Sequence, residues 1–124
     1  MFSHIFVGTN DIEEARRFYD ATLGTLGVAP GVTDPKGRLF YRTSSGTLGV
    51  TRPIDGQPAT GANGGTIGFA AESPEVLKAW HAAGLAHGGT AIEDPPGDRG
   101  NGLWLAYLRD PAGNKLCALC RVKS

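Results

Sequence analysis

Two cysteines near the end of the chain have the spacing of a metal or redox motif. Cys117 and Cys120 stand in "GNKLCALC" (113–120) and are the only two cysteines of the 124 residues. A C-x-x-C pair works when both thiols reach one point, and redox pairs use a helix N-terminus to lower a thiol pKa. The residues around this pair predict a strand, in which residues three apart face opposite sides. We therefore expect neither zinc binding nor disulfide exchange, and Cys120 should be a small buried hydrophobic residue.

The last predicted hairpin gives Cys117 its neighbours. The stretch "GLWLAYLRDPAGNKLCALCRV" (102–122) is typical of two strands around a turn at 110–113. A four-residue loop pairs Arg109 with Asn114, and therefore Ala106 with Cys117. This register places Trp104, Ala106, Cys117 and Leu119 on one face, and Leu105, Tyr107, Leu116, Ala118 and Cys120 on the other.

Two further side chains are candidates for chemistry. His4 lies in the first predicted strand, where it is either a hydrogen-bonded strand histidine or a functional group. A two-residue turn at 45–46 pairs Arg42 with Gly49. On a cleft face Arg42 would hold an anionic group through paired charged hydrogen bonds, whereas at an exposed sheet edge it would have no such role. His81 and His87, on the second predicted helix, are assigned no catalytic role.

The elements that position these residues occur twice in the same order. Each half is predicted to run strand, helix, then three short strands. In the first half these are a strand at 2–8, a helix over 9–24 begun by Asn10 or Asp11, and strands near 26–31, 38–44 and 47–52. In the second they are a strand at 65–71, a helix over 72–89 with Ser73 as its N-cap, a short strand within 90–97, and the final hairpin.

The two halves align without gaps at an offset of half the chain length, which indicates an internal duplication. Ile5 then meets Ile67, and His4 meets Thr66. By the same repeat, Gly49 is the counterpart of Cys117 and Arg42 that of Ala106.

We therefore predict an α+β fold of two tandem βαβββ modules within one domain. Module 1 covers about 1–52, a Pro- and Gly-rich linker about 53–64, and module 2 about 65–124. One helix covers only one face of each sheet, so the other faces curve toward each other as a half-open barrel cup with a cleft.

The composition of the chain limits the classes of partner that we expect it to bind. Lys plus Arg and Asp plus Glu both number 12, the net charge is zero and the pI is about 6.8, so we expect no nucleic-acid partner. The apolar runs are too short to cross a membrane. The start "MFSHIFVG" lacks the features of a signal peptide, and two cysteines make no disulfide framework, so we expect a cytoplasmic protein.

Three segments resemble the vicinal oxygen chelate superfamily, which includes glyoxalase I, bleomycin resistance proteins and extradiol dioxygenases. They are "FSHIFVGTNDIEEARRFYDATLG", "RPIDGQPATGANGGTIGFAA" and "YLRDPAGNKLCAL". In particular they resemble the small single-domain glyoxalase and bleomycin-resistance members, and the resemblance covers essentially the whole chain. The resemblance implies the same paired βαβββ modules.

The resemblance also implies where metal ligands would stand. His4 matches a ligand histidine of the first strand. The place of a second histidine holds Thr66, the place of a glutamate after "DPxGN" holds Cys117, and the matching place in the first module holds Gly49. A catalytic metal usually takes three protein ligands, so we expect no resident metal or other cofactor. If a divalent metal is bound after all, His4 is its one ordinary ligand.

Three functions stay open, and with them the question whether the chain is an enzyme. The first is a small-molecule binder whose cleft is lined by Phe40, Arg42, Thr66 and Trp104 together with His4 and Cys117. The second is a metal-dependent lyase, isomerase or dioxygenase. The third is a metal-free enzyme with His4 as base and Cys117 as nucleophile. The expected partners are a small-molecule ligand and a second copy of the chain in a homodimer, which would cover free strand edges.

Overall fold

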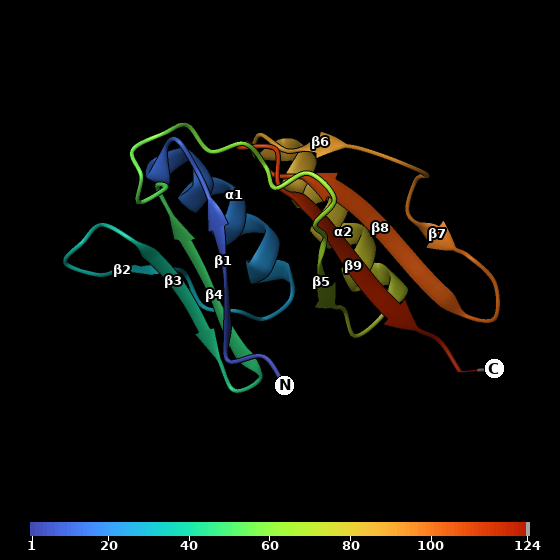
Figure 1. Cartoon of the computed structure of the whole chain (residues 1–124). Helices are drawn as coiled ribbons and strands as arrows, with labels where there is room; N and C mark the ends of the chain where they lie inside the picture. The colour runs from blue at the N-terminus through green and yellow to red at the C-terminus, as the bar shows by residue number, and fades with distance from the viewer. Residues whose placement is uncertain (124) are drawn as a thin grey trace.

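The computed structural model describes residues 1–123 and consists of two sheets, each backed by one helix (Figure 1). The helices pack against each other, so both sheets turn their open faces away from them. This is the predicted α+β fold, and over residues 1–123 the two sheets do not close into a barrel. Ser124, the last residue of the predicted module 2, lies outside the described residues. No helix within residues 1–123 is both long and apolar enough to cross a membrane.

The first sheet has the strand order β1-β4-β3-β2, with β1 parallel to β4 and the other pairs antiparallel. Its elements are β1 (His4–Gly8), α1 (Ile12–Thr25), β2 (Val32–Thr33), β3 (Leu39–Thr43) and β4 (Gly46–Thr51).

The second sheet repeats this plan in the order β5-β9-β8-β6, with the short β7 also paired to β8. Its elements are β5 (Ile67–Ala70), α2 (Pro74–Ala86), β6 (Thr90–Ala91), β7 (Gly97–Asp98), β8 (Leu103–Arg109) and β9 (Lys115–Arg121).

Both helices begin where the sequence predicts. The side chain of Asp11 accepts a hydrogen bond from the Glu14 amide at 3.1 Å, and that of Ser73 accepts one from the Val76 amide at 3.1 Å. Such caps satisfy an amide that the first helical turn leaves without a partner. The helices bury Phe18 and Trp80 among other residues, so one core runs through both halves.

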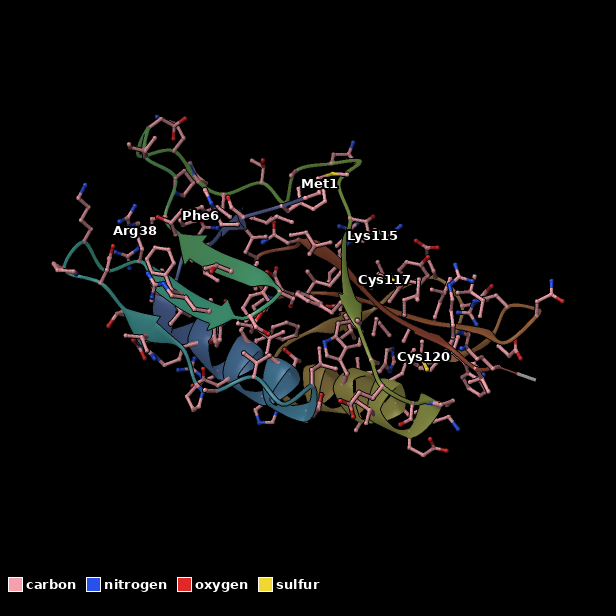
Figure 2. All side chains as sticks on the ribbon, turned by 90° about the horizontal axis from the view of Figure 1, so that it is seen from below. Met1, Phe6, Arg38, Lys115, Cys117 and Cys120 are labelled. Carbon is pink, nitrogen blue, oxygen red and sulfur yellow. The ribbon has the colours of Figure 1, made fainter. Side chains whose placement is uncertain are left out.

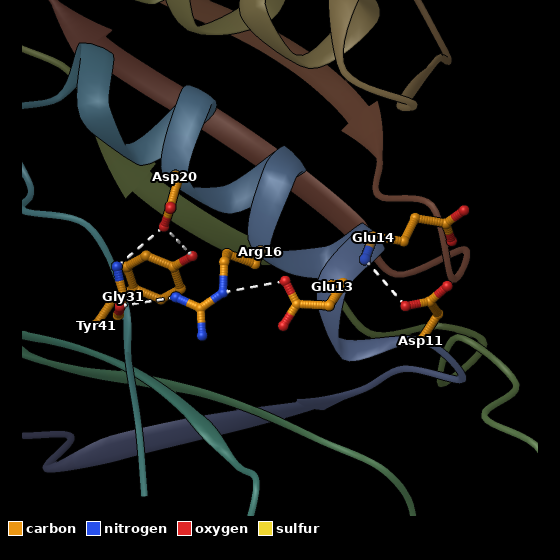
Figure 3. A network of polar contacts seen from close by, with 7 residues as sticks. All are labelled: Asp11, Glu13, Glu14, Arg16, Asp20, Gly31 and Tyr41. Atoms are coloured by element: carbon orange, nitrogen blue, oxygen red, sulfur yellow. Dashed lines mark hydrogen bonds and ion pairs between the residues drawn. The ribbon is translucent and has the colours of Figure 1, made fainter.

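The strand expected near 26–31 does not form, and β2 lies at Val32–Thr33 instead. Two side chains of α1 bind the backbone of Gly31 in place of a neighbouring strand (Figure 3). The Gly31 amide donates to Asp20 at 2.9 Å, and Arg16 donates to the Gly31 carbonyl at 3.0 Å. The hydroxyl of Tyr41 also donates to Asp20, at 2.7 Å, which ties this segment to β3. Hydrogen bonds from nearby side chains therefore take the place of strand pairing in a segment whose sequence pattern predicts a strand.

A buried carboxylate joins the two halves at the end nearest the linker. Asp110 is only 4% exposed, and its side chain accepts hydrogen bonds from the Tyr19 hydroxyl at 2.5 Å and the Asn114 side chain at 2.9 Å. It also accepts hydrogen bonds from the backbone amides of Ala112, at 3.0 Å, and Asn114, at 2.8 Å. Asn114 in turn donates to the Gly8 carbonyl at 2.8 Å. The β8–β9 turn is thereby fixed to both α1 and β1.

The same carboxylate perturbs Tyr19. Burial, followed by the negative charge of Asp110 and the hydrogen bond to it, raises the pKa of Tyr19 well above its ordinary value. The phenol therefore stays protonated and keeps donating over the whole physiological range.

We expect Tyr19→Phe to lower the free energy of unfolding by about 1.5–3 kcal/mol near neutral pH, because Asp110 loses a donor to its buried charge. A raised folded-state pKa means that the contribution of Tyr19 is complete below its unfolded pKa of about 10 and is lost above it, by about 1.4 kcal/mol per pH unit. The gap between wild type and variant should therefore narrow from about pH 8 to about pH 11 in urea unfolding. A gap that stays constant would contradict this account.

Candidate functional site

Three residues form an aromatic row across the open face of the first sheet. In the strand register, Phe6 on β1 lies beside Gly49 on β4, and Gly49 lies beside Phe40 on β3. The two rings meet edge to face, with centroids 5.6 Å apart and planes at 80°. A side chain at Gly49 would overlap the ring of Phe6, so the glycine is what allows that ring to lie across β4. Phe6 nevertheless remains 40% exposed, and Figure 2 shows it on the side of the sheet away from the helices.

A polar row lies two residues along the same strands. Here His4 on β1 is beside Thr47 on β4, and Thr47 is beside Arg42 on β3. The ring of His4 meets the ring of Phe6 edge on at 5.8 Å, and its Nδ1 lies 2.8 Å from the hydroxyl of Ser3. His4 and Arg42 are both exposed. The aromatic and polar rows therefore form one surface with an apolar strip next to a cationic one.

Two arginines approach the ring of Phe40. The guanidinium of Arg42 lies 4.3 Å from the ring centroid and that of Arg38 lies 5.3 Å from it. Arg38 is held by Asp34, which accepts from its Nε at 2.7 Å, and this hydrogen bond is the main reason that the pKa of Asp34 is lowered. Arg42 has no hydrogen bond or ion pair with any of residues 1–123. Its donors are therefore directed to solvent.

The open face of the second sheet has different contents at the equivalent positions. Cys117 on β9 lies between Gly68 on β5 and Tyr107 on β8, as Gly49 lies between Phe6 and Phe40. Cys117 is 7% exposed, and burial raises the pKa of its thiol more than the hydrogen bond with Tyr107 lowers it. The ammonium of Lys115 lies 5.0 Å from the ring of Tyr107. Lys115 also forms an ion pair with the carboxylate of Glu93.

The register of the final hairpin differs from the predicted one by one residue. Arg109 pairs with Lys115 rather than Asn114, and Cys117 pairs with Tyr107 rather than Ala106. The cause is the Asp110 turn, which spans five residues and closes with the Asp110 amide donating to the Asn114 carbonyl. A shift of one residue exchanges the two faces of a strand. The side chains predicted for β8 were therefore assigned to the wrong faces.

Trp104 is the site residue displaced by this error. It pairs with Cys120 and packs against the core on the helix side of the sheet, where the ammonium of Lys78 from α2 lies 5.1 Å from its ring. It therefore does not line the open face. Cys120 packs within the hydrophobic cluster on the helix side of the sheet, whereas Cys117 is buried outside that cluster, so the two cysteines face opposite sides of β9 as predicted.

The register of the first hairpin was also predicted incorrectly. The turn is at 44–45, so Arg42 pairs with Thr47 and Phe40 pairs with Gly49. The counterpart of Arg42 in the second sheet is accordingly Arg109, which pairs with Lys115. Arg42 and Phe40 nevertheless lie on the open face with His4, so three of the proposed site residues are neighbours.

Two cavities lie between the sheets, one at each end of β1. The first, of about 430 Å³, is lined by His4, Ile5, Gly68 and Phe69 among others. The second, of about 590 Å³, lies under the linker and is lined by Phe6, Thr66 and Lys115 among others. Thr66, which directly precedes β5, is therefore close to the aromatic row rather than beside His4.

The structure does not bring His4 and Cys117 together as a base and a nucleophile. Within residues 1–123 no hydrogen bond joins them, and the groups that influence the thiol are Tyr107, the backbone of Ala106, Glu93 and Lys115. The raised pKa of Cys117 favours the neutral thiol over the nucleophilic thiolate.

Sequence reasoning also missed Phe6, although a residue two positions from His4 in a strand must share its face.

The divalent metal that the resemblance implies does not fit these residues. Among residues 1–123 no three side chains of His, Cys, Asp or Glu gather as a metal site. At one ligand place the ring of Phe6 fills the space that a side chain on Gly49 would need. At the others, Thr66 offers only a hydroxyl and Cys117 a buried thiol with a raised pKa. Metal binding would require a deprotonated ligand set that these residues do not supply.

Comparison with known proteins identifies the family. The model of the Glyoxalase/Bleomycin resistance protein/Dioxygenase superfamily matches residues 1–118. The chain belongs to this superfamily. A glyoxalase/bleomycin resistance protein from Albidiferax ferrireducens T118 is 60% identical, with a TM-score of 0.93 over 98% of this chain and 99% of that one.

Solved structures of lower sequence identity share the fold. A glyoxalase-related enzyme from Fulvimarina pelagi is 19% identical, with a TM-score of 0.78 over 98% of this chain and 88% of that one. A lactoylglutathione lyase from Agrobacterium tumefaciens is 20% identical, with a TM-score of 0.68 over 97% of this chain and 92% of that one. No curated protein matches the chain.

We expect Gly49→Ala to disrupt the aromatic row, because the added methyl group would overlap the ring of Phe6. The variant should lose about 1 kcal/mol of stability, at the low end for overpacking because the partly exposed ring can swing outward. NMR ring-current shifts of Phe6 and Phe40 should change at the same time. Gly68→Ala, at the matched strand position but with open space around it, should leave both quantities nearly unchanged. Equal effects of the two substitutions would mean that Gly49 has no special role.

Proposed function

We propose that this glyoxalase-like protein binds a small molecule on the open sheet faces between its two modules, without a stoichiometric metal. The observation that carries the proposal is the aromatic row. Phe6 and Phe40 form an edge-to-face pair that remains partly exposed instead of joining the core. Phe6 also lines the cavity of about 590 Å³ under the linker. Exposed aromatic rings with polar groups beside them are a common lining of small-ligand sites.

The side chains at the candidate site suit a binding role better than they suit either enzyme alternative. A metal-dependent lyase, isomerase or dioxygenase needs ligands where this chain has Gly49, Thr66 and Cys117. A metal-free enzyme using His4 and Cys117 needs an activated thiolate, whereas burial raises the pKa of this thiol. The residues that remain suited to a ligand are Phe6, Phe40, Arg42 and His4, all on one face.

We expect the purified protein to contain far less than one Zn, Ni, Mn or Fe per chain and to carry or accept a small organic molecule. Native mass spectrometry combined with elemental analysis would measure both quantities on one sample. About one metal per chain, lost in His4→Ala, would reject the metal-free proposal and favour the metalloenzyme alternative.

We also propose that the protein acts as a homodimer in a reducing cytoplasm. Support for the dimer comes from apolar side chains left in solvent, including Val32 on the edge strand β2 at 62% exposure and Ile54 in the linker at 105%. Support for the compartment comes from the two free thiols. Nucleic acid and membrane are not proposed as partners, since the net charge is zero.

Light scattering at micromolar concentration should therefore give the mass of two chains. The physical reason is that exposed strand edges and apolar residues lose contact with water when a second copy covers them. The mass of a single chain, unchanged on concentration, would contradict the homodimer.

A further inference from the structure

We propose that the ligand is a small planar aromatic carboxylate, with its ring on the aromatic row and its carboxylate bound by Arg42. This inference rests on the proposed function and adds the chemical class of the ligand. It comes from the juxtaposition of two rows with opposite chemistry on one face. Phe6 and Phe40 offer apolar ring surface, and Arg42 with Thr47 and His4 offers a polar strip beside it.

The spacing of the rows sets the size of the ligand. The rows lie two residues apart along each strand, which corresponds to about 7 Å. A single aromatic ring with a short planar side arm spans this distance. A ring without an arm would reach only one row, so the geometry favours an aryl acid whose carboxylate stands clear of the ring.

The charge of the face determines the sign of the charge that a ligand should carry. The strands β1, β3 and β4 contain no Asp or Glu, so no acidic side chain of these strands competes for a cation or repels an anion. Asp34, which precedes β3, is engaged by Arg38 in an ion pair at 2.5 Å. Asp55 of the linker lines the second cavity together with Phe6, but that cavity includes neither His4 nor Arg42. The face thus presents one unneutralised guanidinium, which matches the single charge of a carboxylate.

Arg42 is held ready for this role. Its guanidinium lies over the ring of Phe40 at 4.3 Å, an arrangement that limits its motion without using its hydrogen-bond donors. A planar guanidinium can offer two parallel N–H groups to the two oxygens of a carboxylate. Arg38 lies over the same ring at 5.3 Å, but its Nε already donates to Asp34, so it serves as a built-in comparison.

Calorimetric titration of the full chain with four probes tests the ligand class. Cinnamate has the ring, the arm and the charge. Cinnamyl alcohol lacks the charge, cyclohexanepropionate lacks the aromatic ring, and phenyl phosphate carries a second charge. We expect cinnamate to bind roughly tenfold more tightly than cinnamyl alcohol, a ratio that a single charge-assisted contact supplies, and more tightly than the other two probes as well.

Two arginine variants test the site. Arg42→Gln should weaken the binding of cinnamate roughly tenfold and leave the affinity for cinnamyl alcohol unchanged. The matched control Arg38→Gln should change neither affinity by more than about threefold. Arg42→Lys should recover part of the loss, because it restores the charge without the planar pair of donors. Thermal melting monitored by circular dichroism verifies that each variant is folded.

Several results would overturn the inference. They are equal affinities for cinnamate and cinnamyl alcohol, tighter binding of phenyl phosphate, equal effects of the two Gln variants, or no binding of any probe. A cinnamate affinity that falls as the protein concentration rises would also reject it, since a second copy would then cover the face. If native mass spectrometry still finds a small organic molecule and no metal, the proposed function survives while the aromatic carboxylate does not. One bound metal per chain rejects the proposed function itself.

Discussion

The buried carboxylate of Asp110 is the constraint on which the rest of the structure depends. A charge that is 4% exposed is tolerated only because donors surround it, and Tyr19, Asn114 and two backbone amides supply them. Meeting that requirement fixes the conformation of the turn, and the turn fixes the register of β8 against β9. The same contacts attach the second sheet to α1 and β1. One charge therefore sets which side chains of the hairpin face the helices and how the two halves meet.

The two open faces show how a duplicated backbone acquired unequal chemistry. In the first sheet the β1 position carries Phe6 and the β4 position carries Gly49. In the second sheet the order is reversed, with Gly68 on β5 and Cys117 on β9. Each neighbouring pair keeps one glycine, so each sheet presents one larger side chain at that level. The first sheet thereby exposes an aromatic surface, whereas the second buries a thiol beside Tyr107.

The sequence predicted the order of elements and the starts of the helices because these depend on local signals such as Asp11 and Ser73. The opposite faces of Cys117 and Cys120 followed from strand geometry alone. The placement of Trp104 failed because the turn is one residue longer than predicted. Asp110 accepts hydrogen bonds from Ala112 and Asn114 within the turn and from Tyr19 on α1, and the residue types alone do not reveal that network. The strand near 26–31 failed for a similar reason, since Gly31 is bound by Arg16 and Asp20 from α1. The local sequence pattern thus predicted the order of elements, whereas hydrogen bonds made by polar side chains decided the register and the position of β2.

The seam between β1 and β5 has a mechanical consequence. No strand pairing crosses it within residues 1–123. The halves are held by helix packing and, at one end, by the hydrogen bonds from Asn114 to Gly8 and from Tyr19 to Asp110. A body fastened along its back and at one end yields most easily at the other end. The softest deformation is therefore a hinge-like widening near His4 and Gly68, where the cavity of about 430 Å³ lies. The molecule combines a stiff end that sets its geometry with a compliant end that can change its width.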